Sequence, residues 1–281
     1  MKRTDGTRVR DEVPMYYLIP QFLIHKYDAM NMVTVDIPEE PLRQYMNEKR
    51  REGRTVSHMA LIMTAYLHMA AEYPYVNRFI MNRNIYQHND FTVSLVVLRP
   101  GTLGNDDEMG KLHFAFTDTV FDVQRKIEEF VAVNTAPEVE NPLDKGMRVL
   151  CKMSGLMRAA VSFVRWMDRH GLMTRGMIEM SPFHASLLMS NLASIRTNHI
   201  YHHIYDFGTT SVSLTMGNLH EVPRRGADGS VELVRCLPLG IVVDDRIASG
   251  HYLAQAFSRI KEFLANPELL ENPGVEEPAA K

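Results

Sequence analysis

Hydrophobic residues along the chain recur with two periods, one typical of strands and one typical of helices. The segment 32–37, MVTVDI, alternates β-branched and other residues, which predicts a strand. The segment 39–53 has a proline in its first turn and a glycine at its end, which predicts a helix. A second helix is predicted over 55–74, where apolar residues form a stripe, Thr55 or Ser57 can cap the first turn, and Pro74 ends it.

The rest of the chain continues this alternation of strands and helices. Two short strands around a turn are predicted over 78–100, a strand over 111–117 and an amphipathic helix over 118–134. The stretch 142–182 is mainly helical and rich in methionine, with a break at Gly171, and its role does not follow from the sequence. Further elements are predicted as buried strands over 184–192 and 208–219, a hairpin over 224–243 and a final helix over 251–270. The pattern predicts one α/β domain over 1–281, with flexible ends at about 1–12 and 272–281.

Composition and charge exclude several classes of function. The formal net charge is −3, with 45% hydrophobic and 23% charged residues, which is typical of a globular protein and does not favour a nucleic-acid partner. The longest apolar region, 156–167, is interrupted by Arg158 and Arg165, so no membrane span is predicted. The first ten residues lead into no apolar signal core, and Cys151 and Cys236 belong to no metal or redox motif. A cytoplasmic protein with reduced thiols is expected.

The turn before the last predicted helix, 244–250, reads DDRIASG. This turn, between a strand and a helix, resembles the active-site loop DHRxxDG of the catalytic core of dihydrolipoyl acyltransferases from 2-oxo acid dehydrogenase complexes. The fold of that core is shared with chloramphenicol acetyltransferase. In the resemblance, Asp245 stands at the family's catalytic histidine and Ser249 at its second aspartate.

The resemblance extends along most of the chain in the family's order. Segment 55–97 is similar to the family's first long helix, its P-x-x-N turn and the hairpin that follows, with Pro74 and Asn77 in the turn. Segment 186–195, SLLMSNLASI, is similar to the family's FTISNLG strand. It puts Ser190 at the hydroxyl that supports the oxyanion. Segment 142–182 is the least similar part, and the lipoyl and peripheral-subunit-binding domains that precede the family's core are predicted to be absent.

The resemblance implies a chloramphenicol acetyltransferase-like two-layer fold, with a mixed sheet and helices on one side, assembled as a homotrimer. Each active site would lie at a subunit interface. Coenzyme A or an acyl-CoA would be a substrate, a small molecule would accept the acyl group, and neither a tightly bound cofactor nor a metal is predicted. In the family's direct acyl transfer, a histidine removes the proton of the attacking group and a hydroxyl supports the tetrahedral oxyanion.

The altered loop changes this chemistry. An exposed aspartate, with a pKa of about 3.9, is too weak a base for a thiol with a pKa of about 8.5, although burial can raise the aspartate pKa. A structural interpretation is that Asp245 pairs with a nearby arginine, such as Arg246, and so closes the turn. Another source of a base is the segment 198–208, NHIYHHIYDFG, the densest group of ionisable residues in the chain. The histidines and carboxylate of this segment are His199, His202, His203 and Asp206.

Three roles are open for this segment: a polar loop at the trimer interface, a replacement acid–base group, or, least favoured, a metal site. The spacing of His203 and Asp206 resembles the histidine–aspartate spacing of the family's loop. Two functions are therefore compatible with the sequence. One is a stand-alone CoA-dependent acyltransferase with a rewired site, using Ser190 for the oxyanion and His202, His203 or Asp245 as base. The other is a catalytically inactive relative that acts as a trimeric assembly or ligand-binding module. The sequence identifies neither the acyl group nor the acceptor.

Overall fold

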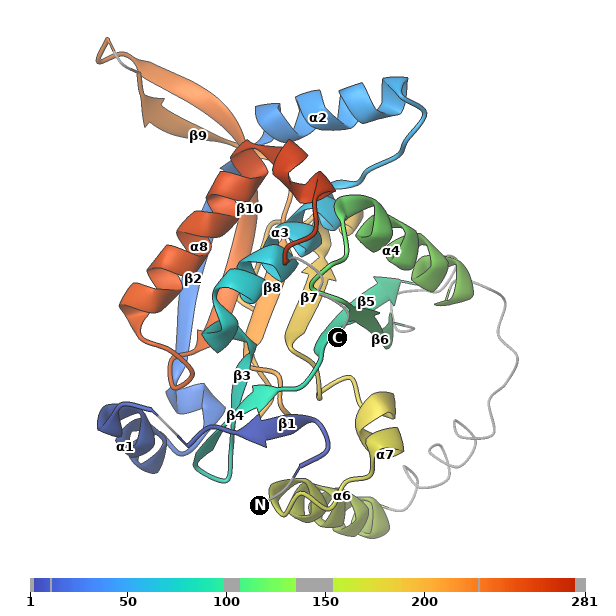
Figure 1. Cartoon of the computed structure of the whole chain (residues 1–281), viewed down its shortest axis with the longest axis vertical. Coiled ribbons are helices and arrows are strands. Elements are labelled where there is room, and N and C mark those ends of the chain that lie inside the picture. Colours follow the sequence, from blue (N-terminus) through green and yellow to red (C-terminus); the bar gives the residue numbers. More distant parts are fainter. Residues whose placement is uncertain (1–2, 11, 99–106, 135–153, 227, 276–281) are drawn as a thin grey trace, which may run out of the picture.

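The chain folds into a mixed sheet with a layer of helices on one side (Figure 1). A computed structural model describes residues 3–10, 12–98, 107–134, 154–226 and 228–275. The large sheet has the strand order β2-β10-β8-β7-β5-β6, with β9 paired to β10. Its strands are β2 (Met30–Pro38), β5 (Phe91–Leu98), β6 (Asp107–Phe114), β7 (Leu187–Asn191), β8 (Val212–Met216), β9 (His220–Arg225) and β10 (Val231–Asp244). β7 runs parallel to β5 and β8, and the other neighbours are antiparallel.

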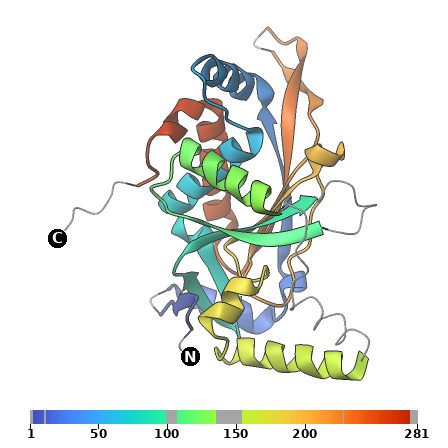
Figure 2. The same ribbon diagram turned by 90° about the vertical axis from the view of Figure 1, so that its right-hand side faces the viewer.

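Four helices cover one face of this sheet (Figure 2): α2 (Glu39–Arg51), α3 (His58–Glu72), α4 (Val120–Asn134) and α8 (Gly250–Ala265). α3 is the innermost helix, because every residue from 60 to 70 is buried. The Ser57 hydroxyl caps α3 by accepting a hydrogen bond from the Ala60 amide at 3.1 Å. The predicted two-layer α/β arrangement, with helices on one side of a mixed sheet, is confirmed.

A second, smaller sheet lies at one end of the molecule and was predicted only in part. Its strand order is β1 (Gly6–Arg8), β4 (Asn84–His88), β3 (Arg78–Met81). β1 falls within the segment expected to be flexible, yet it pairs in register with β4. The region 78–100 contains β3, β4 and β5 rather than two strands. Helix α1 (Pro14–Phe22) follows β1, and it corresponds to no predicted element.

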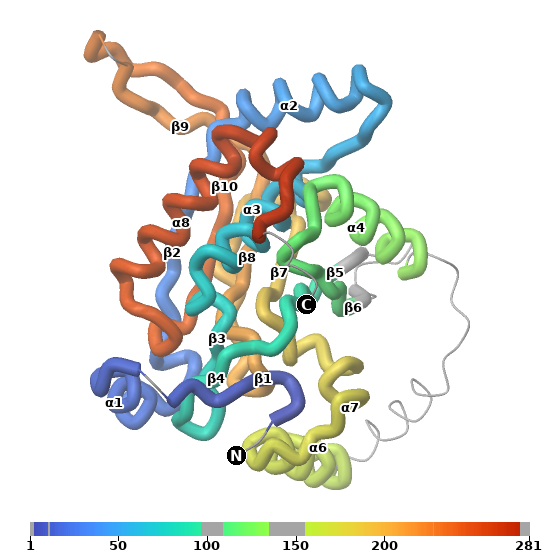
Figure 3. The backbone as a smooth tube through the Cα atoms, in the orientation of Figure 1, coloured from blue at the N-terminus to red at the C-terminus, as the bar shows by residue number. Residues whose placement is uncertain are grey.

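The methionine-rich stretch contains two helices, α6 (Ser154–Arg169) and α7 (Arg175–Met180), and residues 142–153 lie outside the described part. Gly171 has a φ of +65° and ends the turn after α6, as the break predicted. α1 and α6 both lie at the end of the molecule that carries the N-terminus (Figure 3). No helix among the described residues is long and apolar enough to cross a membrane. Short 3₁₀ helices cover Lys26–Asp28, Pro74–Asn77, Leu192–Ile195 and Pro267–Glu271.

Candidate active site

The sheet face opposite the helices, here called the open face, carries small polar side chains. One row across four strands consists of Thr34, Gly240, Thr215 and Ser190, which are register partners on β2, β10, β8 and β7. Their chain neighbours, such as Met189, contribute to the hydrophobic core under the helices. Because side chains alternate between the faces of a sheet, the Ser190 row points to the open face.

The histidine-rich segment lies on this open face and is fixed there through its backbone. The Thr215 hydroxyl is bonded to both the amide and the carbonyl of Ile200, and the Ser213 hydroxyl donates to the His202 carbonyl at 2.6 Å. A Cβ at Gly240 would lie 2.4 Å from the Ile200 carbonyl oxygen, so only glycine allows this close approach. The Ser and Thr residues of β8 thus hold a second layer of chain against the sheet.

Ser190 lies beside this attached segment. It is 8% exposed, and its register partner Thr215 is the residue that holds Ile200. No hydrogen bond joins the Ser190 hydroxyl to another residue of the described part of the chain. Its O–H is therefore available to donate to a ligand oxygen, which is what an oxyanion-stabilising group must do.

The three histidines of the segment differ in their contacts. His199 Nε2 lies 3.1 Å from the Thr34 hydroxyl, and His202 Nδ1 lies 2.8 Å from the His203 carbonyl oxygen. The rings of His202 and His203 stack with centroids 4.8 Å apart. Among the described residues, no group of three or more side chains is arranged to hold a metal ion.

The turn after β10 is closed by Asp244 and Arg246. Arg246 Nε and Nη2 donate to the Asp244 carboxylate at 2.8 and 2.7 Å. Its Nη1 donates to the carbonyl oxygens of Leu23 and Ile24 at 2.9 and 3.0 Å. The predicted pairing of Asp245 with Arg246 is wrong, because the carboxylate at the end of the strand already occupies the guanidinium group.

Asp245 instead accepts a hydrogen bond from Asn31 Nδ2 at 2.7 Å, and its amide donates to the Ala29 carbonyl at 2.8 Å. Burial raises the pKa of Asp245, and the neighbouring Asp244 raises it further, against the lowering effect of Asn31. Asn31 is the register partner of the core residue Val243, so its side chain leaves the sheet on the helix side. Asp245 and the histidine segment therefore lie on opposite sides of the sheet edge.

Ser249 has a structural contact. Its hydroxyl accepts a hydrogen bond from the Tyr252 amide at 3.2 Å and caps α8. In the resemblance this position belongs to a charged aspartate, and the uncharged serine caps the helix without replacing that charge.

Two ionisable residues that sequence reasoning did not connect meet next to this loop. His25 Nδ1 lies 3.0 Å from Asp206 Oδ2, across 181 positions of sequence. Asp206 was noted only for its spacing from His203, and His25 was not singled out. No local pattern marks His25, because its partner comes from the end of the segment attached to the open face.

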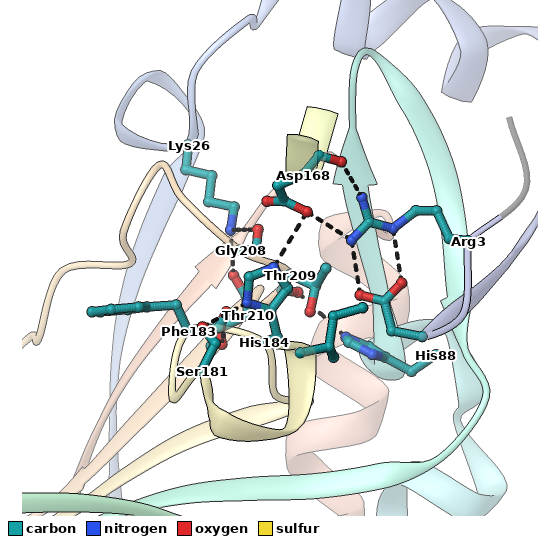
Figure 4. Close-up of polar contacts among 12 residues, drawn as sticks. Arg3, Lys26, His88, Asp168, Ser181, Phe183, His184, Gly208, Thr209 and Thr210 are labelled. Carbon is teal, nitrogen blue, oxygen red and sulfur yellow. Dashed lines mark hydrogen bonds and ion pairs between the residues drawn. The ribbon is translucent and has the colours of Figure 1, made fainter. Parts of the chain in front are cut away.

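A buried polar cluster braces the same end of the molecule (Figure 4). Arg3 donates to Asp168 at 2.8 Å and to both carboxylate oxygens of Asp5. His184 lies between Asp168, at 3.3 Å from Nε2, and the Ser181 hydroxyl, at 2.7 Å from Nδ1. His184 and Asp168 are buried, and Arg3 pairs with the Asp168 carboxylate. The cluster ties residues 3–5 to the end of α6.

Comparisons with known proteins find similarity in structure and not in sequence. No protein-family model matches the chain, and no curated protein matches it. A dihydrolipoamide acetyltransferase of Azotobacter vinelandii, studied for a serine, a histidine and an asparagine in its catalytic mechanism, has a TM-score of 0.59 at 12% identity. The match covers 93% of this chain and 94% of that one.

Two further solved structures extend the similarity. A probable dihydrolipoamide acetyltransferase from Listeria monocytogenes has a TM-score of 0.57 at 14% identity, covering 92% of this chain and 95% of that one. A chloramphenicol acetyltransferase has a TM-score of 0.53 at 13% identity, covering 92% and 99%. The chain therefore has the fold of chloramphenicol acetyltransferase-like acyltransferase cores, as predicted. At these identities the likeness establishes the fold, and the activity has to be argued from the site.

Proposed function

We propose that the protein is an acyltransferase that moves an acyl group from coenzyme A to a small-molecule acceptor through an active site rewired relative to its structural neighbours. The observation that carries the proposal is the shared fold with acetyltransferases over more than nine tenths of both chains. Ser190 supports it, because a free hydroxyl on the open face matches the donor that acyl transfer needs.

The site is proposed to form between copies of the chain in a cytoplasmic homotrimer. Ser190 and Thr34 stand three strands apart, which is about 14 Å across the sheet. The groups near loop 244–250 lie beyond the first residue of β2, so they are still farther from Ser190 of their own chain. The open face also exposes large apolar side chains that a second copy would cover, namely Met32, Ile200 and Tyr201.

In the proposed reaction the acceptor thiol or hydroxyl attacks the thioester carbonyl while a base takes its proton. The resulting oxyanion receives a hydrogen bond from Ser190. The carbon–sulfur bond to coenzyme A then breaks, and the proton passes from the base to the departing thiolate. His202, His203 and Asp245 are the bases predicted from the sequence. His202 presents Nε2 when Nδ1 donates to the His203 carbonyl, and the raised pKa of Asp245 brings that carboxylate closer to working pH.

The test is release of free coenzyme A from acetyl-CoA and longer acyl-CoAs across a panel of thiol, hydroxyl and amine acceptors. Ser190→Ala is expected to lower kcat about 100-fold, because it removes one oxyanion donor. Ser194→Ala, on the adjacent exposed turn, is the matched control and is expected to keep wild-type turnover. Absence of turnover by the wild-type protein with every donor and acceptor would contradict the proposal.

One observation favours the inactive alternative, a trimeric assembly or ligand-binding module. The position of the family's histidine holds a carboxylate engaged by Asn31, and it lies on the helix side of the sheet edge. This alternative predicts that acyl-CoA binds, measured by calorimetry, without any release of free coenzyme A. Turnover that depends on Ser190 excludes it.

A further inference from the structure

His25 has the geometry of an oriented imidazole base. A carboxylate can only accept hydrogen bonds, so the contact between His25 Nδ1 and Asp206 places the ring proton on Nδ1. Nε2 then carries the lone pair. Tyr27 stacks on the ring, with centroids 4.8 Å apart and planes inclined by 8°. These two contacts orient the ring, the side chain is 38% exposed, and no hydrogen bond to another described residue engages Nε2.

Asp206 is itself held in place. The Lys26 amide donates to its second carboxylate oxygen at 3.2 Å, and Arg165 of α6 lies 3.7 Å away. The buried Lys26 ammonium donates to the carbonyl oxygens of Gly208 and Thr210, which fixes the chain after Asp206 against the chain after His25. Burial raises the pKa of Asp206, but the bonds from His25 and the Lys26 amide outweigh it and hold that pKa below its usual value.

The pair lies against the loop in which the resemblance leads one to expect a catalytic histidine. Arg246 of that loop donates to the carbonyl oxygens of Leu23 and Ile24, and the latter belongs to the peptide that joins Ile24 to His25. The Asp245 amide donates to the carbonyl oxygen of Ala29, which follows His25 in the sequence. The segment 23–29 therefore lies against the loop, and it carries an imidazole next to a loop whose own sequence has none.

We propose that His25, oriented by Asp206, is the general base of the acyl-transfer site. This inference rests on the acyltransferase function proposed above. His25 Nε2 takes the proton of the acceptor thiol or hydroxyl as the acceptor atom bonds to the thioester carbon. The bond between that carbon and the sulfur of coenzyme A breaks, and the imidazolium returns the proton to the thiolate. The Asp206 carboxylate stabilises the imidazolium formed between these steps.

Among the other histidines, His113 also contacts a carboxylate, that of Glu179, but it lies on β6, at the edge of the sheet opposite β2 and away from loop 244–250. His202 is oriented by a backbone carbonyl, which carries no charge to stabilise an imidazolium. His220 and Asp36 have nearly the same exposure as the pair, 40% and 30%, but their atoms are 3.4 Å apart without hydrogen-bond geometry and lie at the opposite end of β2. His220 is therefore a matched control.

The experiment compares His25→Asn with His220→Asn in the coenzyme A release assay, using acetyl-CoA or the longer acyl-CoA that the wild type prefers. Asparagine keeps a donor for Asp206 and removes the basic nitrogen. His25→Asn is expected to lower kcat about 100-fold or more with KM unchanged, while His220→Asn stays at the wild-type rate. In a His25→Ala variant, added imidazole is expected to restore part of the lost turnover, which a purely structural role would not allow.

The outcomes separate this inference from the proposed function. Wild-type protein without turnover overturns the acyltransferase proposal itself. Wild-type turnover that survives His25→Asn within about threefold overturns the role of His25 and leaves the acyltransferase intact. Equal losses in His25→Asn and His220→Asn, or no rescue by imidazole, also overturn it. A His202→Asn or His203→Asn loss larger than that of His25→Asn assigns the base to the segment on the open face.

Discussion

Two pairs of ionisable side chains lie at residues 23–26. They differ in burial and in how many of their nitrogen and oxygen atoms remain without a hydrogen-bond partner. Arg246 and Asp244 are 2% and 0% exposed, and the guanidinium donates to the carboxylate and to two backbone carbonyls. His25 and Asp206 are 38% and 26% exposed, and Nε2 of His25 has no hydrogen bond to any residue that the structure describes.

The difference shows how one region of the chain can hold both a pair that stabilises the fold and a pair that can react. A saturated, buried pair can only hold the chain, because every group that could act on a ligand is already bonded. A half-exposed pair with one free nitrogen keeps its orientation and can still exchange a proton. By this comparison, loop 244–250 holds the segment 23–29 in place, and that segment carries the proposed base, His25.

The largest effect is expected from breaking the buried pair. Arg246→Met leaves the Asp244 carboxylate buried without its partner, and the free energy of unfolding is expected to fall by about 3–5 kcal/mol. Urea denaturation followed by circular dichroism measures this change. Arg125→Met, which removes exposed pairs with Asp122 and Glu129 on α4, is the control and should leave the midpoint unchanged. If the urea midpoint of Arg246→Met is also unchanged, the buried pair does not stabilise the fold.

An intermediate effect is expected from Asp206→Asn, which keeps the size of the side chain but removes its charge. The amide can donate to His25 Nδ1, which would move the ring proton to Nε2 and take away the basic lone pair. We expect kcat to fall about 100-fold with KM and the urea midpoint little changed. A higher KM with unchanged kcat would instead make Asp206 a substrate-binding residue.

The smallest effect is expected at Asp245, where the pKa is raised by burial and by Asp244. A raised pKa means that folding disfavours the charged carboxylate, so this residue lowers stability above its folded-state pKa and ceases to do so as the pH falls through it. Asp245→Asn is therefore expected to raise the urea midpoint slightly at pH 7 and to lose this advantage in acid. Because the side chain is partly exposed, the gain should stay below about 1 kcal/mol. A lower midpoint at pH 7 would contradict the sign.

Much of the fold follows from the sequence, because its information is local. The alternation in β2, the Ser57 cap of α3 and the stripe on α8 each depend on residues close together in the chain. Ser190 also falls where the collinear resemblance puts it, on a buried strand.

The polar contacts of the site could not be predicted in the same way. The spacing of Asp206 from His203 gave no sign that the partner of Asp206 is His25, and Arg246 was predicted to pair with Asp245 although the strand-end Asp244 holds it. The missed contact and the wrong pairing have one physical cause. Spacing gives the distance along the chain, whereas a charged group pairs with whichever partner the fold brings near it while both are shielded from water. The N-terminal segment, with its short strand and uncharged helix, gave no periodic pattern to interpret.

The most direct test of the account is complementation between two inactive variants, because the proposed site takes Ser190 from one copy and His25 from another. Ser190→Ala and His25→Asn chains, carrying different affinity tags, are co-expressed and the mixed assembly is purified through both tags. Every trimer purified through both tags contains both kinds of chain, and one of its three sites combines an intact Ser190 with an intact His25, so about a third of the wild-type turnover should return. The control mixes Ser190→Ala with a double variant that carries both changes, and it should stay inactive. A mixed assembly with no recovered turnover would contradict a site shared between copies.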